Sequence, residues 1–518
     1  MNHRLHFWLH LWKACQNTHR LNMTKANKFT CPGGALRAAW ACLGVAPTRS
    51  RVLPALLTCL GLVLTGQATA QTFTTLYRFT DGGDGGNPEA GLVLSGNILY
   101  GTAENGGSAG HGTVFAVNTD GTGFTNLYSF TNGSDGALPA SELILSGNTL
   151  YGTAVGGGSI APGYGTVFAV NTDGTGFKTL YSFTSGSLGR NGGGEPYAGL
   201  ILSGSTLYGV AANGGSGGGG TVFAVNTNGT GFKTLYNFTD GSDGDGPLGF
   251  LTLSGNTLYG TAYGGGSGGF GTVFAVNTNG TGFRTLHSFT SVTQIGTNSD
   301  GTHPEAGLVL SSNTLYGTAA YGGASGNGTL FALNTDGTGF TTLYSFTNGS
   351  YGANPTSALV LSGDTLYGTA GGGSSGNGTV FAVNTDGTGF RTLYSFTATS
   401  DGFLGGTNSD GTGPEAGLIL SGNTLYGTAS GGGAYGYGTV FSLSLPSVTA
   451  PQLTITPSGG NVVLTWPTNY SGFTLQSTTN LGSSAVWSTN SPPPVVLNGQ
   501  NVVTNPISGA QQFFRLSQ

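Results

Sequence analysis

Carboxylates are the main side chains that could do chemistry in the part of this chain that follows residue 70. That part has no cysteine and only three histidines. In the stretch "TDGSDGDGP" at 239–247, three aspartates stand two or three residues apart. Carboxylate oxygens are the hard ligands that Ca²⁺ prefers, so the stretch predicts a calcium site formed by Asp240, Asp243 and Asp245. Asp-Gly is also common in tight turns, which is the alternative interpretation of the same residues.

A second group of carboxylates is predicted to bind a ligand because its members recur at one place in a repeated pattern. They are Asp81, Asp84, Glu89, Asp300, Glu305, Asp401, Asp410 and Glu415. No thiol is present in this region and histidines are few, so the sequence assigns no proton-transfer pair. We therefore expect binding rather than catalysis, with no catalytic residue and with calcium as the one cofactor considered.

The elements that must position these carboxylates form a sevenfold repeat. The motif "LYG" occurs seven times. "GTVF", or its near copy "GTLF", also occurs seven times and begins at Gly112, Gly165, Gly220, Gly271, Gly328, Gly378 and Gly438. The copies lie about 50 residues apart, which is typical of propeller blades and too long for a solenoid coil. Each copy contains four short apolar segments joined by turns, such as "AGLVLSG", "NILYGTA", "GTVFAVN" and "FTNLYSFT" in the first.

The last copy of the repeat lacks its fourth segment. After "GTVFSLSL" at 438–445 the chain becomes Pro-rich, whereas "FTTLYRFT" at 73–80 stands alone before the first copy. Pairing the two would give every copy four strands and would leave no free sheet edge. We therefore predict an all-β chain in which residues 71–445 form a closed seven-bladed β-propeller. Leu76 and Tyr77 should then lie beside Val440 and Phe441.

One face of such a propeller would be acidic. Two kinds of segment share this face: those that precede the first strand of each copy, and those that connect its second and third strands. All eight predicted ligand-binding carboxylates lie in or next to the segments that precede a first strand. The longest insertions fall there as well, and such insertions usually mark the binding side of a repeat protein. The aromatic residues of "LYG", "GTVF" and "LYSF" are expected to pack between blades. His287 should be a packing variant of the tyrosine in "LYSF".

The repeat unit resembles that of the Gloeo/Verruco (GloVer) family of choice-of-anchor tandem-repeat proteins. The resemblance rests on the consensus "LVLSGNTLYGTA", "GTVFAVNTDGTGF" and "TLYSFT", and it extends over residues 73–445. It implies a secreted or surface protein with propeller-like repeats, and it brings no catalytic motif. The strand order is also similar to that of WD-repeat and kelch propellers, a likeness that says little about function.

The chain after the last repeat has a different character. Residues 446–451 are expected to form a linker and residues 452–518 a separate module. Seven short β-type segments, from "LTITP" to "QQFFRLS", predict a small β-sandwich similar to fibronectin type III or immunoglobulin-like modules, with Trp466 in its core.

The first 70 residues are predicted to be a signal peptide with a long basic flank. An apolar stretch from Val52 to about Gly66 precedes Ala68-Thr69-Ala70, so we expect cleavage near Ala70. The rest of the chain has 7 Lys and Arg against 20 Asp and Glu, a net charge of −13. This charge disfavours nucleic acid as a partner. No later stretch is long and apolar enough for a transmembrane helix.

We therefore expect a secreted or cell-surface protein that binds an extracellular glycan or protein without catalysis. Two other functions fit the same sequence. Propellers also host lyases and hydrolases that act on polysaccharides, and two close carboxylates in a pocket at the centre of the ring would favour such an enzyme. A purely structural surface component is the third interpretation.

Overall fold

The computed structural model describes residues 71–159, 163–184, 190–400, 406–446, 451–468, 473–480, 486–489, 492–506 and 512–517. The predicted signal peptide at 1–70 and most of the predicted linker, residues 447–450, lie outside the described residues. The described part consists of β-strands and one short 3-10 helix, η1 (Gly349–Tyr351), which confirms the all-β prediction. No helix in it is long and apolar enough to cross a membrane.

Between Thr72 and Ser444 the described strands form seven four-stranded antiparallel sheets, named here the first to the seventh sheet. The first contains β2 (Val93–Ser95), β3 (Ile98–Ala103), β4 (Thr113–Asn118) and β5 (Thr125–Ser129). The second contains β6 (Ile144–Ser146), β7 (Thr149–Ala154), β8 (Thr166–Asn171) and β9 (Lys178–Ser182). The third contains β11 (Ile201–Ser203), β12 (Thr206–Ala211), β14 (Thr221–Asn226) and β15 (Lys233–Asn237). Beside it, β10 (Arg190–Gly194) pairs with β13 (Asn213–Gly215).

The remaining sheets repeat the same order. The fourth contains β16 (Thr252–Ser254), β17 (Thr257–Ala262), β18 (Thr272–Asn277) and β19 (Arg284–Ser288). The fifth contains β20 (Val309–Ser311), β21 (Thr314–Ala319), β22 (Thr329–Asn334) and β23 (Thr341–Ser345). The sixth contains β24 (Val360–Ser362), β25 (Thr365–Ala370), β26 (Thr379–Asn384) and β27 (Arg391–Ser395). The seventh contains β28 (Ile419–Ser421), β29 (Thr424–Ala429), β30 (Thr439–Ser444) and β1 (Thr72–Arg78).

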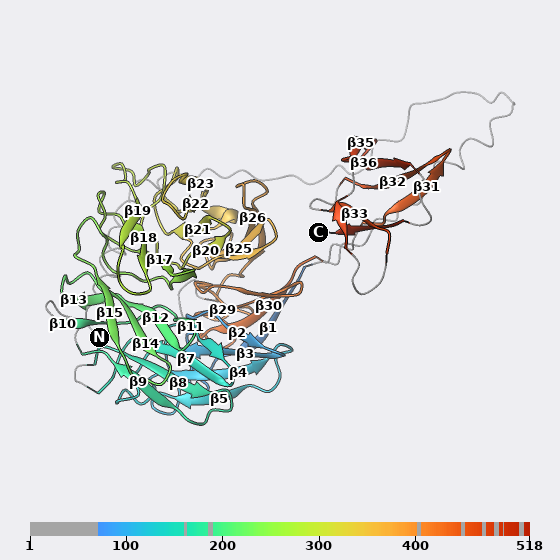
Figure 1. The fold of residues 1–518 in the computed structure, drawn as a ribbon. Helices are drawn as coiled ribbons and strands as arrows, with labels where there is room; N and C mark the ends of the chain where they lie inside the picture. The colour runs from blue at the N-terminus through green and yellow to red at the C-terminus, as the bar shows by residue number, and fades with distance from the viewer. Residues whose placement is uncertain are drawn as a thin grey trace, which may run out of the picture. The chain divides into compact units, whose positions relative to one another are not determined.

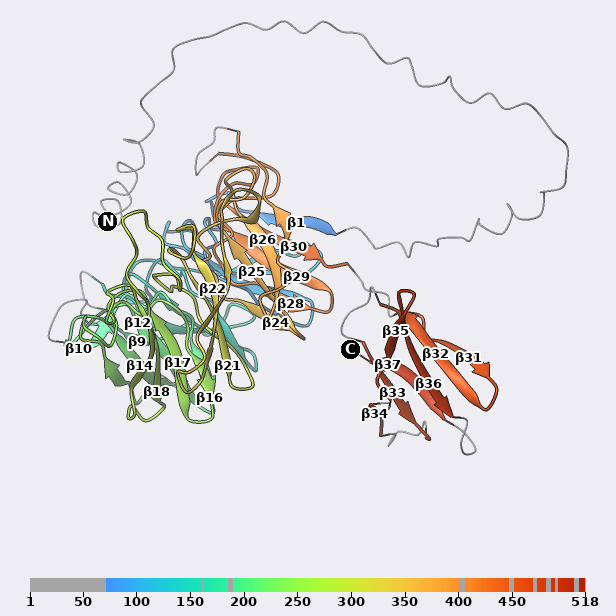
Figure 2. The ribbon, with the colours of Figure 1, turned by 90° about the horizontal axis from the view of Figure 1, so that it is seen from above.

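The seventh sheet takes its fourth strand from the other end of the repeat region. The blue β1 and the orange β30 lie side by side in Figures 1 and 2 and pair antiparallel. Tyr77 pairs with Val440 and Thr75 with Phe441, so the predicted pairing is confirmed. The register shifts between Thr75 and Tyr77, which places Leu76 in a β-bulge. The same shift recurs where β5 meets β4.

The third strand of each sheet is apolar on both faces because both faces are covered. In β4, Val114, Phe115 and Val117 are fully buried. Hydrophobic clusters join each sheet to the next, and one further cluster joins Leu76 and Val440 of the seventh sheet to Phe115 of the first. The seventh sheet therefore packs on the first as every other sheet packs on the next, and β1 contributes to this packing.

Aromatic rings repeat at the boundary between successive sheets, as predicted. A ring on each fourth strand stacks on a Phe just before or at the start of the fourth strand of the next sheet, with centroids 3.5 to 4.0 Å apart. Phe73 stacks on Tyr394 at 4.0 Å, which brings β1 into the same pattern. His287 takes the place of the tyrosine and stacks on Phe340 at 3.8 Å. The prediction that it is a packing variant is confirmed.

Backbone hydrogen bonds also link each sheet to the preceding one. One N–H before each first strand donates to a carbonyl of the preceding sheet at 2.8 to 3.0 Å; the donors are Asn87, Leu138, Glu195, Gly246, His303, Asn354 and Gly413. The bond from Asn87 reaches Tyr437 and therefore joins the first sheet to the seventh. A proline follows each donor. A Cβ on Gly438 would lie 2.5 Å from Cδ of Pro88, which is too close. Gly438 also has φ 95°, so only glycine fits at this position.

The C-terminal residues form two further sheets. One contains β31 (Thr454–Ser458), β32 (Asn461–Pro467), β36 (Gln500–Pro506) and β35 (Val495–Leu497), and the other contains β34 (Ser488–Thr489), β33 (Thr474–Thr478) and β37 (Phe513–Ser517). All seven predicted segments are thus strands. Leu464, Trp466 and Val503 of one sheet share a buried cluster with Leu475 of the other, and Trp466 is 1 % exposed, as predicted for a core residue.

Candidate functional site

A central cavity is lined by all seven sheets. The segment just before the first strand of each sheet contributes three residues, namely 89–91, 140–142, 197–199, 248–250, 305–307, 356–358 and 415–417. The cavity has a volume of ≈ 110 Å³. One place in the repeat unit therefore supplies the described lining, because packing of each sheet on the next, and of the seventh on the first, brings its seven copies together.

Threonine hydroxyls hold these lining segments in place. Thr428 of β29 donates to the carbonyl of Ala90 at 2.9 Å, and Thr102 of β3 donates to the carbonyl of Ser141 at 3.1 Å. In the second, fourth, fifth and sixth sheets, a threonine of the second strand donates in the same way to the lining segment of the following sheet. The third sheet has Val210 at this position. The lining is thus fixed by buried bonds between sheets.

Four glutamates line the cavity, namely Glu89, Glu142, Glu305 and Glu415. Glu142 is half-buried in the lining, and desolvation of its carboxyl raises its pKa to about 7. A Cβ on Gly91 would lie 3.2 Å from the carboxyl carbon of Glu142, so this side chain reaches the lining segment of the first sheet. Burial, followed by the negative charge of Glu415, raises the pKa of Glu305 to about 7. The cavity therefore contains carboxyl groups that change charge near neutral pH.

An aromatic cluster lies close to Glu305. The ring of His303 lies 4.5 Å from that of Tyr263 and 5.7 Å from that of Tyr321, measured between centroids. Burial, then the charge of Glu305, raises the pKa of Tyr263 to about 12. Burial lowers the pKa of His303, which disfavours the charged form of this ring. Tyr321 is 36 % exposed, so the cluster gives a partly accessible apolar surface beside the carboxylates.

Three of the predicted ligand-binding aspartates hold the fold together instead of pointing at the cavity. Asp84 accepts hydrogen bonds from the Tyr77 hydroxyl at 3.1 Å and from the Thr80 N–H at 3.0 Å. Asp300 accepts equivalent bonds from His287 and Thr290, and Asp410 accepts them from Tyr394 and Thr397. Each of these aspartates thus ties the end of one sheet's fourth strand to the segment that enters the next sheet.

Asp243, predicted as a calcium ligand, has the same structural role. It accepts hydrogen bonds from the Tyr236 hydroxyl at 2.9 Å and from the Thr239 N–H at 3.0 Å. Burial opposes the charge of Asp243, but these bonds outweigh it and lower its pKa. Burial and then the charge of Asp240 raise the pKa of Asp245. Among the described residues, no three His, Cys, Asp or Glu side chains are grouped so that they could hold a metal ion. The calcium site stays a prediction.

Replacing Asp243 with Ala is expected to lower the free energy of unfolding by about 1.5–3 kcal/mol, because buried donors lose a charged acceptor. Denaturant unfolding would measure this loss. Asp364→Ala, at an exposed turn position, is the matched control and should change the free energy by less than about 0.5 kcal/mol. Equal effects of the two changes would contradict the structural role of Asp243.

The remaining predicted residues fall into two groups. Glu89, Glu305 and Glu415 meet in the central cavity, together with Glu142. Asp81 is exposed, has φ 59° and lies in the turn before the first sheet, and Asp401 lies outside the described residues. The sequence analysis did not predict Glu142 as a ligand-binding residue. Glu142 is the third residue after its proline in "PASE", whereas Glu89 is the first residue after its proline in "PEA". Alignment of the copies on the preceding proline would have placed Glu142 level with Gly91.

These features define a class, a β-rich repeat protein in which copies of one unit meet around a central site. The chain belongs to the Gloeobacter/Verrucomicrobia repeat family, whose model matches residues 60–192, 187–299 and 290–482. The resemblance seen in the sequence is confirmed. A comparison with curated proteins gave no match.

Several solved structures are similar to parts of the chain. A nidogen/laminin complex matches at 14 % identity and TM-score 0.37, over 58 % of this chain and 92 % of that chain. An oligogalacturonate lyase in complex with manganese matches at 10 % identity and TM-score 0.43, over 72 % and 93 %. A putative 6-phosphogluconolactonase from Bacteroides uniformis matches at 14 % identity and TM-score 0.42, over 81 % and 98 %. Likenesses at these scores carry no argument about function.

Proposed function

We propose that this protein is an exported, non-catalytic binding protein built on a closed seven-bladed β-propeller, with a small β-sandwich at its C-terminal end. The pairing of β1 with β30 supports the closed ring, as do the bond from Asn87 to Tyr437 and the cluster that joins the seventh sheet to the first. The apolar stretch before Ala70 supports export.

The observation that carries the binding function is the convergence of four glutamates from four different sheets on one cavity. Ligand pockets for whole small molecules measure about 300–1,000 Å³, whereas this cavity has ≈ 110 Å³. It therefore suits a single protruding group of a larger partner. The partner is an extracellular glycan or protein that places a basic or hydroxyl group among the carboxylates, beside the ring cluster of Tyr263, His303 and Tyr321.

Screening the full chain against arrays of glycans and extracellular proteins would identify the ligand. Replacing both Glu305 and Glu415 with Gln is expected to weaken binding of that ligand at least about tenfold, because two charged contacts are lost. The matched control replaces Asp336 and Asp386 with Asn, which removes the same charge from exposed turns. Asn228 and Asn279 occupy the equivalent positions in other sheets and make the same turn bonds. Equal affinities of the two double variants would contradict the proposal.

A second candidate function is an enzyme that acts on polysaccharides. One observation favours it: Glu305 and Glu415 lie close enough in the central cavity for one charge to raise the pKa of the other. A protonated and an ionised carboxyl side by side are what glycoside cleavage requires. Release of sugar fragments from a polysaccharide by the parent chain, with loss of turnover but not of binding in Glu305→Gln, would establish this function. A chain that binds and cleaves nothing in these screens would support a purely structural role.

A further inference from the structure

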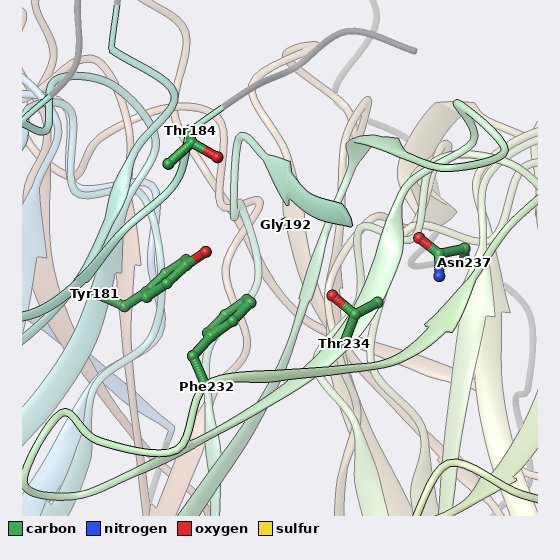
Figure 3. A pocket seen from close by; sticks show the side chains of 6 residues that line it. All are labelled: Tyr181, Thr184, Gly192, Phe232, Thr234 and Asn237. Carbon is green, nitrogen blue, oxygen red and sulfur yellow. The ribbon is translucent and has the colours of Figure 1, made fainter. Parts of the chain in front are cut away.

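A larger cavity, of ≈ 550 Å³, lies at the boundary between the second and third sheets. Figure 3 shows its lining, which consists of Tyr181, Thr184, Gly192, Phe232, Thr234 and Asn237. Tyr181 belongs to β9, Gly192 to β10, and Thr234 and Asn237 to β15. The cavity differs from the central one because none of the described residues that line it is a carboxylate.

At the equivalent place in five other segments, an aspartate fills the space. Asp84, Asp135, Asp243, Asp300 and Asp410 each bind the ring hydroxyl or imidazole of a fourth strand and the N–H of the threonine three residues later. Each also offers its backbone carbonyl to the first threonine of a third strand. The carboxylate is thus a regular part of the boundary between sheets.

Gly192 stands where these aspartates stand. A Cβ on Gly85, which follows Asp84, would meet Thr113 Oγ1 and the Ala103 methyl. A Cβ on Gly193 would meet Thr221 Oγ1 and the Ala211 methyl, the equivalent atoms of the third sheet. Gly193 therefore corresponds to Gly85, and Gly192 to Asp84. A Cβ on Gly192 would lie 3.0 Å from the Tyr181 hydroxyl and 3.7 Å from Thr184 Oγ1.

The groups that bind the aspartate elsewhere have lost their partner at this boundary. Among the described residues, the Tyr181 hydroxyl has no hydrogen-bond acceptor, whereas the Tyr77 hydroxyl has Asp84. Thr221 Oγ1 is buried without a partner in the same part of the chain. Thr379 Oγ1, at the equivalent position of the sixth sheet, is also buried without a partner. The segment that enters the sixth sheet has no aspartate either, because Tyr351 occupies that position. In both segments that lack the aspartate, the backbone carbonyl at its position does not accept from this threonine.

The local sequence has also changed its charge. Between Thr184 and Gly194 there is one basic residue, Arg190, and no acid. None of the other six corresponding segments contains a Lys or Arg. The nearest acid, Glu195, already accepts a hydrogen bond from Asn213 at 2.7 Å. The segment 184–194 is therefore the one of the seven that contains a basic residue.

We propose that this cavity binds the carboxylate of an external ligand, held by the Tyr181 hydroxyl and Thr184 as an aspartate is held in five other segments. The volume of ≈ 550 Å³ falls in the range of about 300–1,000 Å³ that small-molecule sites have, so a sugar acid or the end of a peptide fits. The stacked rings of Tyr181 and Phe232, 3.5 Å apart, supply an apolar wall. The site is separate from the central cavity, and the proposal does not rest on the binding function proposed there.

Two changes at Gly192 in the full-length chain test this proposal. Gly192→Asp would supply the carboxylate from the chain itself, so it should raise Tm by about 1–3 °C and weaken carboxylate binding at least about tenfold. Gly192→Asn adds a side chain of the same shape as Asp but without the charge. It should therefore raise Tm less and weaken carboxylate binding less than Gly192→Asp does. Gly192 does not have a positive φ, so a side chain is accommodated once the Tyr181 ring shifts slightly. Tyr181→Phe, which removes only the hydroxyl, serves as a second variant that keeps the ring stack.

The probes are D-glucuronate, its neutral counterpart D-glucose, and N-acetyl-aspartate. Their binding to each chain is measured by titration calorimetry and NMR. Binding of both acids but not of glucose supports the proposal for either source of carboxylate. Binding of glucuronate alone supports a sugar acid, and binding of N-acetyl-aspartate alone supports a peptide. Binding of neither acid, or equal binding by the parent, Gly192→Asp and Tyr181→Phe, would overturn it.

Discussion

Replacing Phe79 with Ala is expected to lower the free energy of unfolding of this protein by about 3–5 kcal/mol. Phe79 follows β1, at the start of the described chain, yet it is fully buried in the cluster between the seventh and first sheets. Its ring meets Phe115 edge to face, with centroids 5.2 Å apart. Truncation would leave a cavity in a core to which both the seventh and the first sheet contribute. Denaturant unfolding followed by fluorescence would measure the loss.

Phe130 is the matched control for this prediction. It occupies the same position after β5, is equally buried and meets Phe168 at 5.1 Å. If β1 completes the ring, Phe79→Ala and Phe130→Ala should cost about the same free energy, within about 0.5 kcal/mol. A cost below about 1 kcal/mol for Phe79→Ala alone would mean that β1 is not part of the cooperative core.

The sequence could predict β1 because strand pairing follows from counting the strand types. Each copy of the repeat has four segments, and only "FTTLYRFT" at 73–80 and the end of the last copy are incomplete. The bulge at Leu76 could not be predicted in this way. The Leu and Tyr of "LYRF" are both large and apolar, so the sequence does not show which of them leaves the ladder.

The roles of the aspartates were beyond the reach of sequence for a different reason. Asp84 lies 4 residues after its threonine partner, Asp300 lies 10 after, and Asp410 lies 13 after. The insertions hide a contact that is the same in space, so these residues looked like variable surface acids. This changes the design of binding experiments, because Asp300→Asn or Asp410→Asn would disturb the boundary between sheets as well as any ligand.

The central site shows the opposite relation between sequence and space. Glu89, Glu305 and Glu415 stand at one place in the repeat and do meet in the cavity. The seven copies converge because each sheet packs on the next and the seventh packs on the first through β1, so the prediction of this site depended on the prediction of β1. The pKa shifts of Glu142 and Glu305 depend on how much protein surrounds each carboxyl, which residue types and spacing do not show.

The stability of the protein is expected to fall as the pH rises from 5 to 8, and Glu142 should account for much of this change. Burial raises the pKa of Glu142 from 4.5 to about 7 in the folded state, so folding favours its protonated form. The contribution is fully present below the unfolded pKa and is lost as the pH rises through the folded one. A shift of this size corresponds to about 3 kcal/mol at pH 8.

Replacing Glu142 with Gln removes the charge and keeps the shape of the side chain. The variant should therefore be more stable than the parent by about 3 kcal/mol at pH 8 and nearly equal to it near pH 4.5, where Glu142 is protonated in the folded chain and about half protonated in the unfolded chain. Glu305 should leave the variant with a smaller slope of the same sign. Denaturant unfolding at several pH values above 4.5 avoids the acid range in which Asp135, Asp243 and Asp300, whose pKa values are lowered, become protonated. Identical pH profiles for the two chains would show that the carboxyl of Glu142 is solvated and would contradict its assignment as a buried acid of the central cavity.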